Sequence, residues 1–176
     1  MNLPNKLTLM RAVLVPVFMV FAAFSRIGTA EYNPTAHLVA GIIFAVASFT
    51  DFGKFMDPLA DKCLTTAAFV YMMADGLCHP VVLAIIMFRE FAVAGVRMIA
   101  AGSGTVIAAN MWGKVKTVLQ MVTVLFYYFV PPFMGSTDIM AFGIITQVLC
   151  WLVALVTVLS GGIYLWQNRS CFMQAK

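Results

Sequence analysis

The sequence is poor in charge and in side chains that bind metals or form cross-links. Charged residues make up 10% of the 176 residues, against about 25% in a typical soluble domain. Water is therefore excluded as the main solvent, because a soluble core of this size needs a polar surface. The four cysteines stand far apart without a C-x-x-C motif, which argues against a disulfide framework or a zinc site. The net charge of +4 is too scattered for a surface that binds nucleic acid.

What the sequence has in abundance is apolar residues, at 62% of the chain. Apolar runs recur from Ala12 to Trp166 and predict about six transmembrane helices. The predicted spans lie near residues 12–25, 36–50, 55–74, 80–101, 115–134 and 139–166. We expect an all-α, polytopic membrane protein that forms one domain over residues 1–176. An alternative for the first span is a secretory signal, because basic residues precede it and small residues follow it.

The basic residues gather on one predicted side of the membrane. When the loops are assigned alternately to the two sides, one side receives Lys6, Arg11, Lys54, Lys62, Lys114, Lys116, Arg169 and Lys176, whereas Arg26 falls on the other. Basic residues near helix ends favour the cytoplasmic side. The distribution therefore predicts that both termini and the loops near 51–55 and 102–114 are cytoplasmic.

The segment 51–62 concentrates charge at the predicted beginning of the third span. Pro58 is tolerated in a first helical turn, and Asp57 and Asp61 then lie four residues apart on one face. Two carboxylates in this arrangement suit a hard cation such as Mg²⁺ or Mn²⁺. Gly53 leaves room for a ligand or a backbone to come close. The alternative is that the acids only complement the helix dipole and pair with neighbouring lysines.

Further charged residues lie in or beside the fourth and fifth spans. Arg89 and Arg97 share one helical face, and intramembrane arginines need a partner. One interpretation pairs them with Glu90 or an aspartate, and the other gives Arg97 a phosphate to bind. Lys114 and Lys116 are by themselves typical of basic anchors on the cytoplasmic side of the membrane.

Near the amino end, polar residues recur every third position along one helical stripe, at Asn5, Thr8 and Arg11. Such a stripe is typical of an interfacial cap whose basic side chain extends to the membrane surface. His37 and His79 have no obvious partners in the sequence, and we treat neither as a ligand.

The string Gly53-x-x-x-Asp57-x-x-x-Asp61 resembles the second half of the signature of the CDP-alcohol phosphotransferases. That signature reads D-x-x-D-G-x-x-A-R, a short spacer, then G-x-x-x-D-x-x-x-D. Other segments are similar to the bacterial phosphatidylglycerophosphate synthase branch of the family, namely residues 2–11, 52–62, 89–97 and 113–117. Together these segments span nearly the whole chain.

The resemblance implies an enzyme that transfers a phosphatidyl group from CDP-diacylglycerol to sn-glycerol 3-phosphate and releases CMP. It implies a cavity facing the cytoplasm of a bacterial inner membrane, in which carboxylates hold two divalent cations, Mg²⁺ or Mn²⁺. By the same resemblance Asp51, Asp57 and Asp61 are metal ligands, and Asp61 is also the general base. Its implied substrate-binding residues are Gly53, Arg97, Lys114, Lys116, Asn5, Thr8 and Arg11. The oligomeric state is left open, a homodimer included.

One half of the signature is missing. After Ser48-Phe-Thr-Asp51 the chain continues directly with Phe52-Gly53, so the second aspartate, its glycine and the arginine are absent. Roughly fifteen to twenty residues are lacking by the motif spacing, and Asp51 is either the first family aspartate or the residue before the Phe-Gly pair. We favour the loss of a segment from an intact enzyme over a natural inactive relative or a substituting residue. The chain as it stands should be catalytically impaired.

Other functions compete with this one. Within the family, the alternative is a cardiolipin synthase or another CDP-alcohol transferase. Outside it, the alternatives are a non-catalytic membrane relative and a small transporter in which Arg89, Glu90 and Arg97 line a path.

Overall fold

The structure, a computed structural model, describes residues 3–27, 32–49, 58–102, 111–134, 138–167 and 169, with the side chains of residues 3–9, 11, 12, 49 and 58–61 outside the description. Over these residues the regular structure is entirely helical, as predicted. The elements are α1 (Leu3–Ala23), α2 (Pro34–Phe49), α3 (Pro58–Ala74), α4 (Pro80–Gly102), α5 (Met111–Phe129), a 3₁₀ turn (Pro131–Phe133) and α6 (Ile139–Gln167).

Proline marks the beginning of three helices. Pro34, Pro58 and Pro80 are the first residues of α2, α3 and α4, where the backbone donor that proline lacks has no helical partner in any case. At α2 the side chain of Asn33 accepts hydrogen bonds from the backbone N–H groups of residues 35 and 36, at 3.1 and 3.2 Å. This is the arrangement of a helix N-cap. The interpretation of Pro58 as a first-turn residue of the third helix is therefore confirmed.

The largest differences from the hydropathy pattern lie at two helix boundaries. Helix α1 begins at Leu3, about two and a half turns before the apolar run at residue 12, because polar residues at a membrane surface can remain helical without being apolar. Helix α5 ends at Phe129 rather than near 134. Its end follows from Pro131 and Pro132, which cannot continue the backbone hydrogen bonds and instead form the 3₁₀ turn.

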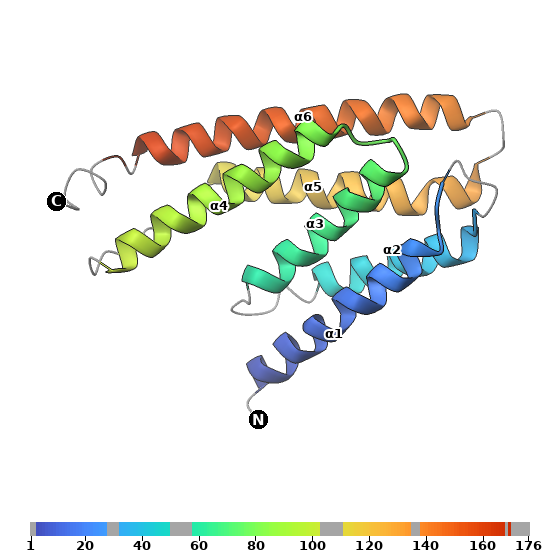
Figure 1. Ribbon diagram of the computed structural model, residues 1–176, viewed down its shortest axis with the longest axis horizontal. Helices are drawn as coiled ribbons and strands as arrows, with labels where there is room; N and C mark the ends of the chain where they lie inside the picture. The colour runs from blue at the N-terminus through green and yellow to red at the C-terminus, as the bar shows by residue number, and fades with distance from the viewer. Residues whose placement is uncertain are drawn as a thin grey trace.

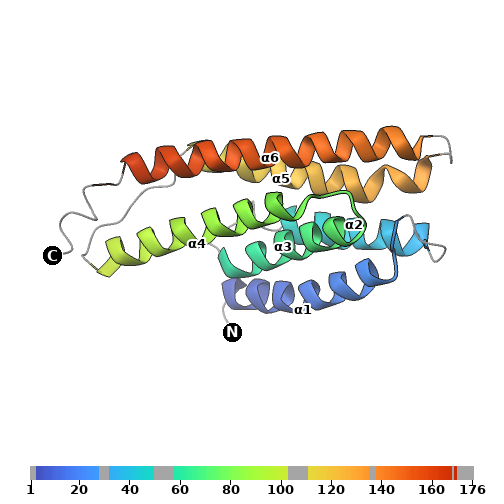
Figure 2. The ribbon, with the colours of Figure 1, turned by 45° about the horizontal axis from the view of Figure 1, so that its top comes forward.

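The helices run alternately up and down in one bundle (Figures 1 and 2). Helices α4 and α5 both pack along α6, α1 packs on α2 and α3, and α2 packs on α5. We call the end at which α1, α3 and α5 begin the proximal end, which lies toward the left of Figure 1, and the opposite end the distal end. This alternation is the one that the loop assignment predicted.

Asp75 ties three elements together at the distal end. Its carboxylate accepts hydrogen bonds from Arg26 Nε at 2.8 Å, the Ile27 backbone N–H at 2.9 Å and the Tyr127 hydroxyl at 2.6 Å. The Asp75 side chain is 2% exposed, and a buried carboxylate needs such partners. Arg26, the one basic residue that the sequence assigned to this side, thus has an ion-pair partner there.

Both histidines also have partners at the distal end, contrary to their appearance in the sequence. His37 is fully buried, and its Nε2 donates a hydrogen bond to the Tyr127 carbonyl oxygen at 2.8 Å, while Nδ1 lies 3.2 Å from the carbonyl and hydroxyl oxygens of Ser25. His79 stacks on Trp151 with 5.9 Å between ring centroids. Their partners are far away in the sequence, which is why the sequence did not reveal them.

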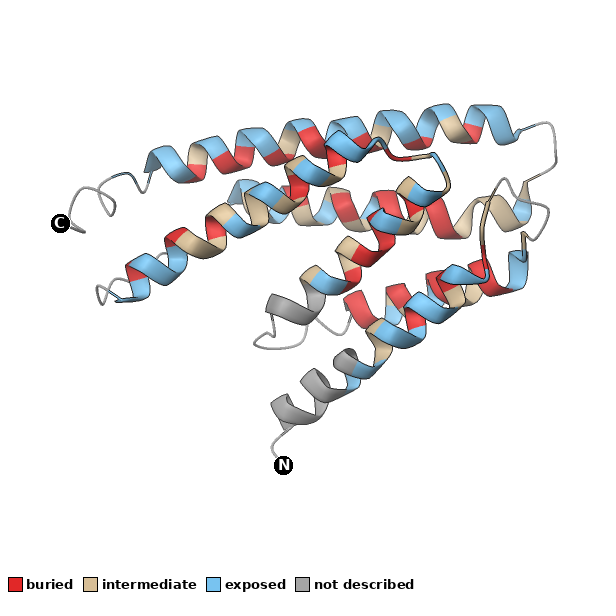
Figure 3. Cartoon of the chain, viewed as in Figure 1, coloured by how far each residue is buried: buried red, intermediate tan, exposed pale blue. Residues whose placement is uncertain are grey.

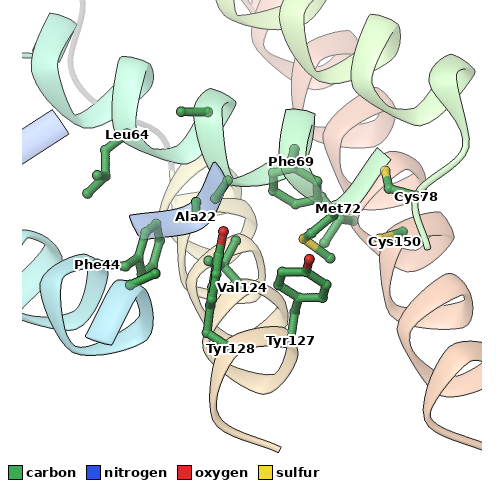
Figure 4. Close-up of a cluster of buried hydrophobic side chains, with 14 of the residues drawn as sticks. Ala22, Phe44, Leu64, Phe69, Met72, Cys78, Val124, Tyr127, Tyr128 and Cys150 are labelled. Carbon is green, nitrogen blue, oxygen red and sulfur yellow. The ribbon is translucent and has the colours of Figure 1, made fainter. Parts of the chain in front are cut away.

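The core between these helices is aromatic. Phe18, Phe44, Phe69, Tyr127 and Tyr128 are almost completely buried, and Figure 4 shows several of these rings facing one another from α2, α3 and α5. The rings of Phe18 and Tyr128 meet edge to face at 5.5 Å, a favourable arrangement for aromatic pairs. In the described part of the chain, Cys63, Cys78 and Cys150 are free thiols.

The outward faces of the helices carry many large apolar side chains. Figure 3 shows exposed residues along the full length of α4 and α6, and these include Phe88, Phe91, Met98, Leu155 and Val158. Within the described part of the chain, α6 is the one helix that is both long and apolar enough to cross a membrane by itself. Helix α4 has the length but carries three charged residues, Arg89, Glu90 and Arg97.

Candidate functional site

Basic side chains from three helices converge at the proximal end. Lys62 lies in the second turn of α3, Arg89 and Arg97 lie on α4, and Lys114 and Lys116 lie in the first turns of α5. The helix alternation brings them together, because the ion pairs of Lys62 and Lys116 with Glu90 place the first turns of α3 and α5 beside the middle of α4. The structure thus places the predicted cationic residues toward the end of the bundle where α3 begins, at residues 58–62.

Glu90 is the common partner of three of these cations. Its Oε1 accepts a hydrogen bond from Arg89 Nη1 at 3.1 Å and is also bound by Lys116 Nζ, and its Oε2 lies 3.5 Å from Lys62 Nζ. One carboxylate thereby joins α3, α4 and α5. The cluster retains a net charge of about +2, since three cations share one anion.

The two lysines of α5 lie in different surroundings. Lys114 is exposed, whereas the Lys116 side chain is 4% exposed and is bound to Glu90, itself 17% exposed. Removing one partner of a buried ion pair costs about 3–5 kcal/mol, because it leaves the other charge uncompensated. Lys116 is therefore part of an internal ion-pair network, while Lys114 is available at the surface.

Arg89 lies in a notch formed by glycines. A Cβ added at Gly161 of α6 would lie 2.9 Å from Arg89 Cγ, and one at Gly113 of α5 would lie 3.6 Å from Arg89 Nη2. A side chain at position 161 would displace the arginine stem, so α6 approaches α4 closely only because this residue has none. The buried Arg89 Nε has no hydrogen-bond partner among the described residues.

Arg97 lies two turns further along α4 and is exposed. Its Nε donates a hydrogen bond to the Tyr164 hydroxyl at 3.3 Å, and its guanidinium lies 5.7 Å from the centre of the Tyr164 ring. Of the two interpretations of the arginines, pairing with Glu90 applies to Arg89. Arg97 forms an ion pair with no carboxylate in the part of the chain that the structure describes, and its guanidinium can accept an anion.

The predicted metal ligands are only partly covered by the structure. Asp61 lies in the first turn of α3, directly before Lys62, but its side chain is outside the description, as are the side chains of Asn5, Thr8 and Arg11 on α1. Asp51, Gly53 and Asp57 lie wholly outside the described residues.

Among the described residues no three acidic, histidine or cysteine side chains gather as a metal site. Glu90 does not fit a metal ligand, because three cations already surround its carboxylate. The chemistry of the Asp51, Asp57 and Asp61 donor set does fit Mg²⁺ or Mn²⁺, which prefer carboxylate oxygens.

The sequence did not identify Glu90 as the centre of the cluster. One interpretation of the sequence pairs Glu90 with Arg89 or Arg97, but none pairs it with Lys62 or Lys116. A signal was present, since Glu90 is the single acidic residue between Asp75 and Asp138. Any buried cation of α4 or α5 that pairs within these two helices must therefore pair with it.

Comparison with known proteins decides the family. The sequence model of the family described as CDP-alcohol phosphatidyltransferase matches residues 1–52 and 48–159. The chain belongs to this family. As a CDP-alcohol phosphatidyltransferase family member, it is 41% identical over 143 residues to a protein of Bacillus subtilis, covering 70% of this chain and 74% of the relative. That relative is named CDP-diacylglycerol--glycerol-3-phosphate 3-phosphatidyltransferase. Two further relatives carry the same name.

The other two relatives come from Mycoplasma pneumoniae, with 31% identity over 73% of this chain and 68% of the relative, and from Rickettsia bellii, with 26% identity over 93% of each. The comparison with the Rickettsia bellii protein runs over 180 positions, which is more than the 176 residues of this chain. The relative therefore has residues that this family member lacks. The family match also falls into two parts that overlap at residues 48–52, where the sequence departs from the signature.

Proposed function

We propose that this protein transfers a phosphatidyl group from CDP-diacylglycerol to sn-glycerol 3-phosphate, giving phosphatidylglycerophosphate and CMP. The observation that carries this proposal is the 41% identity to the Bacillus subtilis relative, whose name states that reaction. The cationic proximal end supports it, because both substrates are anions that need positive charge to bind. The acidic beginning of α3 at the same end supplies the carboxylates that phosphoryl chemistry with divalent cations requires.

In this proposal the roles divide between two groups of residues. Asp51, Asp57 and Asp61 would hold Mg²⁺ or Mn²⁺, which when bound neutralises charge on the pyrophosphate and on the leaving CMP. Asp61 accepts the proton from the glycerol hydroxyl as that oxygen forms its bond to the lipid-side phosphorus. Arg97 and Lys114 bind the acceptor phosphate, with Lys116 behind them in the ion-pair network. Gly53, Asn5, Thr8 and Arg11 are the remaining substrate contacts.

We further propose that the bundle forms a single domain that spans the membrane with six helices, its proximal end in the cytoplasm. The exposed apolar faces of α4 and α6 support burial in lipid, because water would not favour them. The basic residues of the proximal end support the orientation. Labelling a cysteine introduced at residue 2 from each side of the membrane tests it, and reaction from outside would contradict it.

The interruption after Asp51 is most simply a lost segment. The two-part family match supports a loss near residues 48–52, and the extra positions in the comparison with the Rickettsia bellii relative support the loss of a segment from the chain. The remainder of the site, from Arg89 to Lys116, still forms a closed ion-pair network. The remaining Asp57 and Asp61 and the Lys114-x-Lys116 pair support the same explanation, because a protein that had long been inactive would have little reason to keep them.

A test of acceptor choice separates the proposed reaction from its alternatives. The test uses a restored protein, in which the segment of the Bacillus subtilis relative that corresponds to the missing half of the signature is inserted between Thr50 and Phe52. CMP release from CDP-diacylglycerol is then measured with different acceptors. We expect release with glycerol 3-phosphate and little with phosphatidylglycerol, the acceptor of a cardiolipin synthase. Release with phosphatidylglycerol alone would favour that alternative, and release with neither would favour a non-catalytic relative.

Arg97 gives a second prediction in the same restored protein. Arg97→Ala should raise the KM for glycerol 3-phosphate about tenfold to a hundredfold, the usual range for a lost hydrogen bond to a charged group. Arg97→Lys should recover only part of the loss, because an ammonium does not reproduce the planar fork. Tyr164→Phe is the control, since it removes the hydroxyl that Arg97 binds but leaves the guanidinium. An unchanged KM in Arg97→Ala would remove this residue from the acceptor site.

A further inference from the structure

Glu90 has a role that the proposed reaction does not by itself require. Its carboxylate is surrounded by Arg89, Lys116 and Lys62, so it is not free to bind a phosphate or a metal ion. What it does is connect helices. Lys62 belongs to α3 and Lys116 to α5, and the two ammonium groups meet on opposite oxygens of the one carboxylate.

We propose that Glu90 is a positioning residue that fixes the beginning of α3 relative to the beginning of α5. Lys62 directly follows Asp61, so the ion pair with Glu90 holds the first turns of α3 at a set distance from α4 and α5. Lys116 is almost fully buried and fixes the other side of the connection. The functional meaning of this connection rests on the proposed function, in which α3 carries the carboxylates and α5 carries part of the cationic site.

The surroundings of Glu90 make this connection specific. Arg89 Nη1 binds the same oxygen as Lys116, and the stem of Arg89 fills the notch at Gly161 of α6. The carboxylate is thus held against α6 as well and cannot follow α3 if α3 moves. Without the carboxylate, three cations would face one another at close range, and their repulsion would push α3 and α5 apart.

The test measures this distance directly and needs no catalytic activity. The exposed Cys63 reports on the beginning of α3, and a cysteine introduced at Val115, which is 50% exposed, reports on the beginning of α5. With the other native cysteines replaced by alanine, nitroxide labels at these two positions give an inter-spin distance distribution by pulsed electron paramagnetic resonance. We expect one narrow peak in the parent protein and a longer, broader distribution in Glu90→Gln.

Asp75→Asn is the matched control. Asp75 also joins three elements through one carboxylate, but at the distal end. Asp75→Asn should leave the 63–115 distance distribution unchanged. A second pair of labels, on cysteines that replace the exposed Phe24 and Phe133, reports on the distal end. The distance distribution of this pair should change in Asp75→Asn and not in Glu90→Gln.

Two further variants cover the case in which Glu90→Gln does not fold. Lys62→Met removes the α3 side of the connection but keeps the buried Glu90–Lys116 pair, and it should broaden the distribution without lengthening it. Glu90→Asp keeps the negative charge on a shorter side chain, and its distance distribution should lie between those of the parent protein and Glu90→Gln.

The proposal is overturned if Lys62→Met and the Glu90 variants leave both the mean and the width of the 63–115 distance distribution unchanged, or if Asp75→Asn alters this distribution equally. The first result would mean that Glu90 does not set the distance, and the second that any loss of stability does. Failure of the transfer reaction would not alter the distances, so the two proposals fail independently.

Discussion

Insertion of the missing segment between Thr50 and Phe52 should raise CMP release from CDP-diacylglycerol by about a thousandfold or more over the chain of 176 residues. The physical reason is the loss of carboxylate ligands, since charge stabilisation by bound cations is worth several kcal/mol in the transition state and each 1.36 kcal/mol is a factor of ten. Release should require glycerol 3-phosphate and Mg²⁺ or Mn²⁺, and a chelator should abolish it.

The matched control is an insert of the same length in which the two aspartates of D-x-x-D are asparagines. It restores the connection between α2 and α3 without restoring the carboxylates, and it should remain inactive. If the chain of 176 residues turned over as fast as the restored protein, the proposed ligand set would be wrong. If the asparagine insert were as active as the aspartate insert, the length of the connection rather than its carboxylates would be what the chain lacks.

Asp61→Asn in the restored protein should lower kcat by about a hundredfold or more, the usual range for loss of a general base. Asparagine keeps the size of the side chain but removes the group that accepts the hydroxyl proton. The KM for glycerol 3-phosphate should change far less, because Asp61 is not proposed to bind the acceptor phosphate. Steady-state rates at saturating and limiting acceptor separate the two constants.

Asp138→Asn is the control for this substitution. Asp138 is an exposed acidic residue that precedes α6 at the distal end, and its replacement should leave both constants unchanged. A loss of kcat equal for the two variants would indicate a general effect of charge. An unchanged kcat in Asp61→Asn would show that another group accepts the proton.

The local features of the helices could be predicted because they depend on neighbouring residues. The six helices follow from runs of apolar residues, and the beginning of α3 follows from Pro58, whose ring fits a first helical turn. The predicted helix boundaries were wrong where a property other than apolarity decides where a helix begins or ends. The polar first turns of α1 lie outside the apolar run at residue 12, and the Pro131–Pro132 pair ends α5 inside one.

The candidate site divides in the same way. The family motif identified the Asp57–Asp61 segment and Arg97 as candidates, because a motif is a property of the sequence alone. The sequence treated Lys114 and Lys116 alike, whereas the structure exposes the first and buries the second against Glu90. Their difference depends on which face of α5 meets α4, and two residues of spacing turn a helix by more than half a circle.

By itself, the sequence determined the helical class, the family and the order of the helices, because each of these is encoded by composition or by residues close together in the chain, and by its motif it predicted the carboxylate segment. The tertiary structure decided which charges meet. Lys62 and Lys116 are far apart in the sequence and share one carboxylate only because α3 and α5 begin at the same end of the bundle, beside the middle of α4. Ion pairing in a region with few acidic groups depends on proximity in space, and the packing of α4 against α6 at Gly161 sets that proximity.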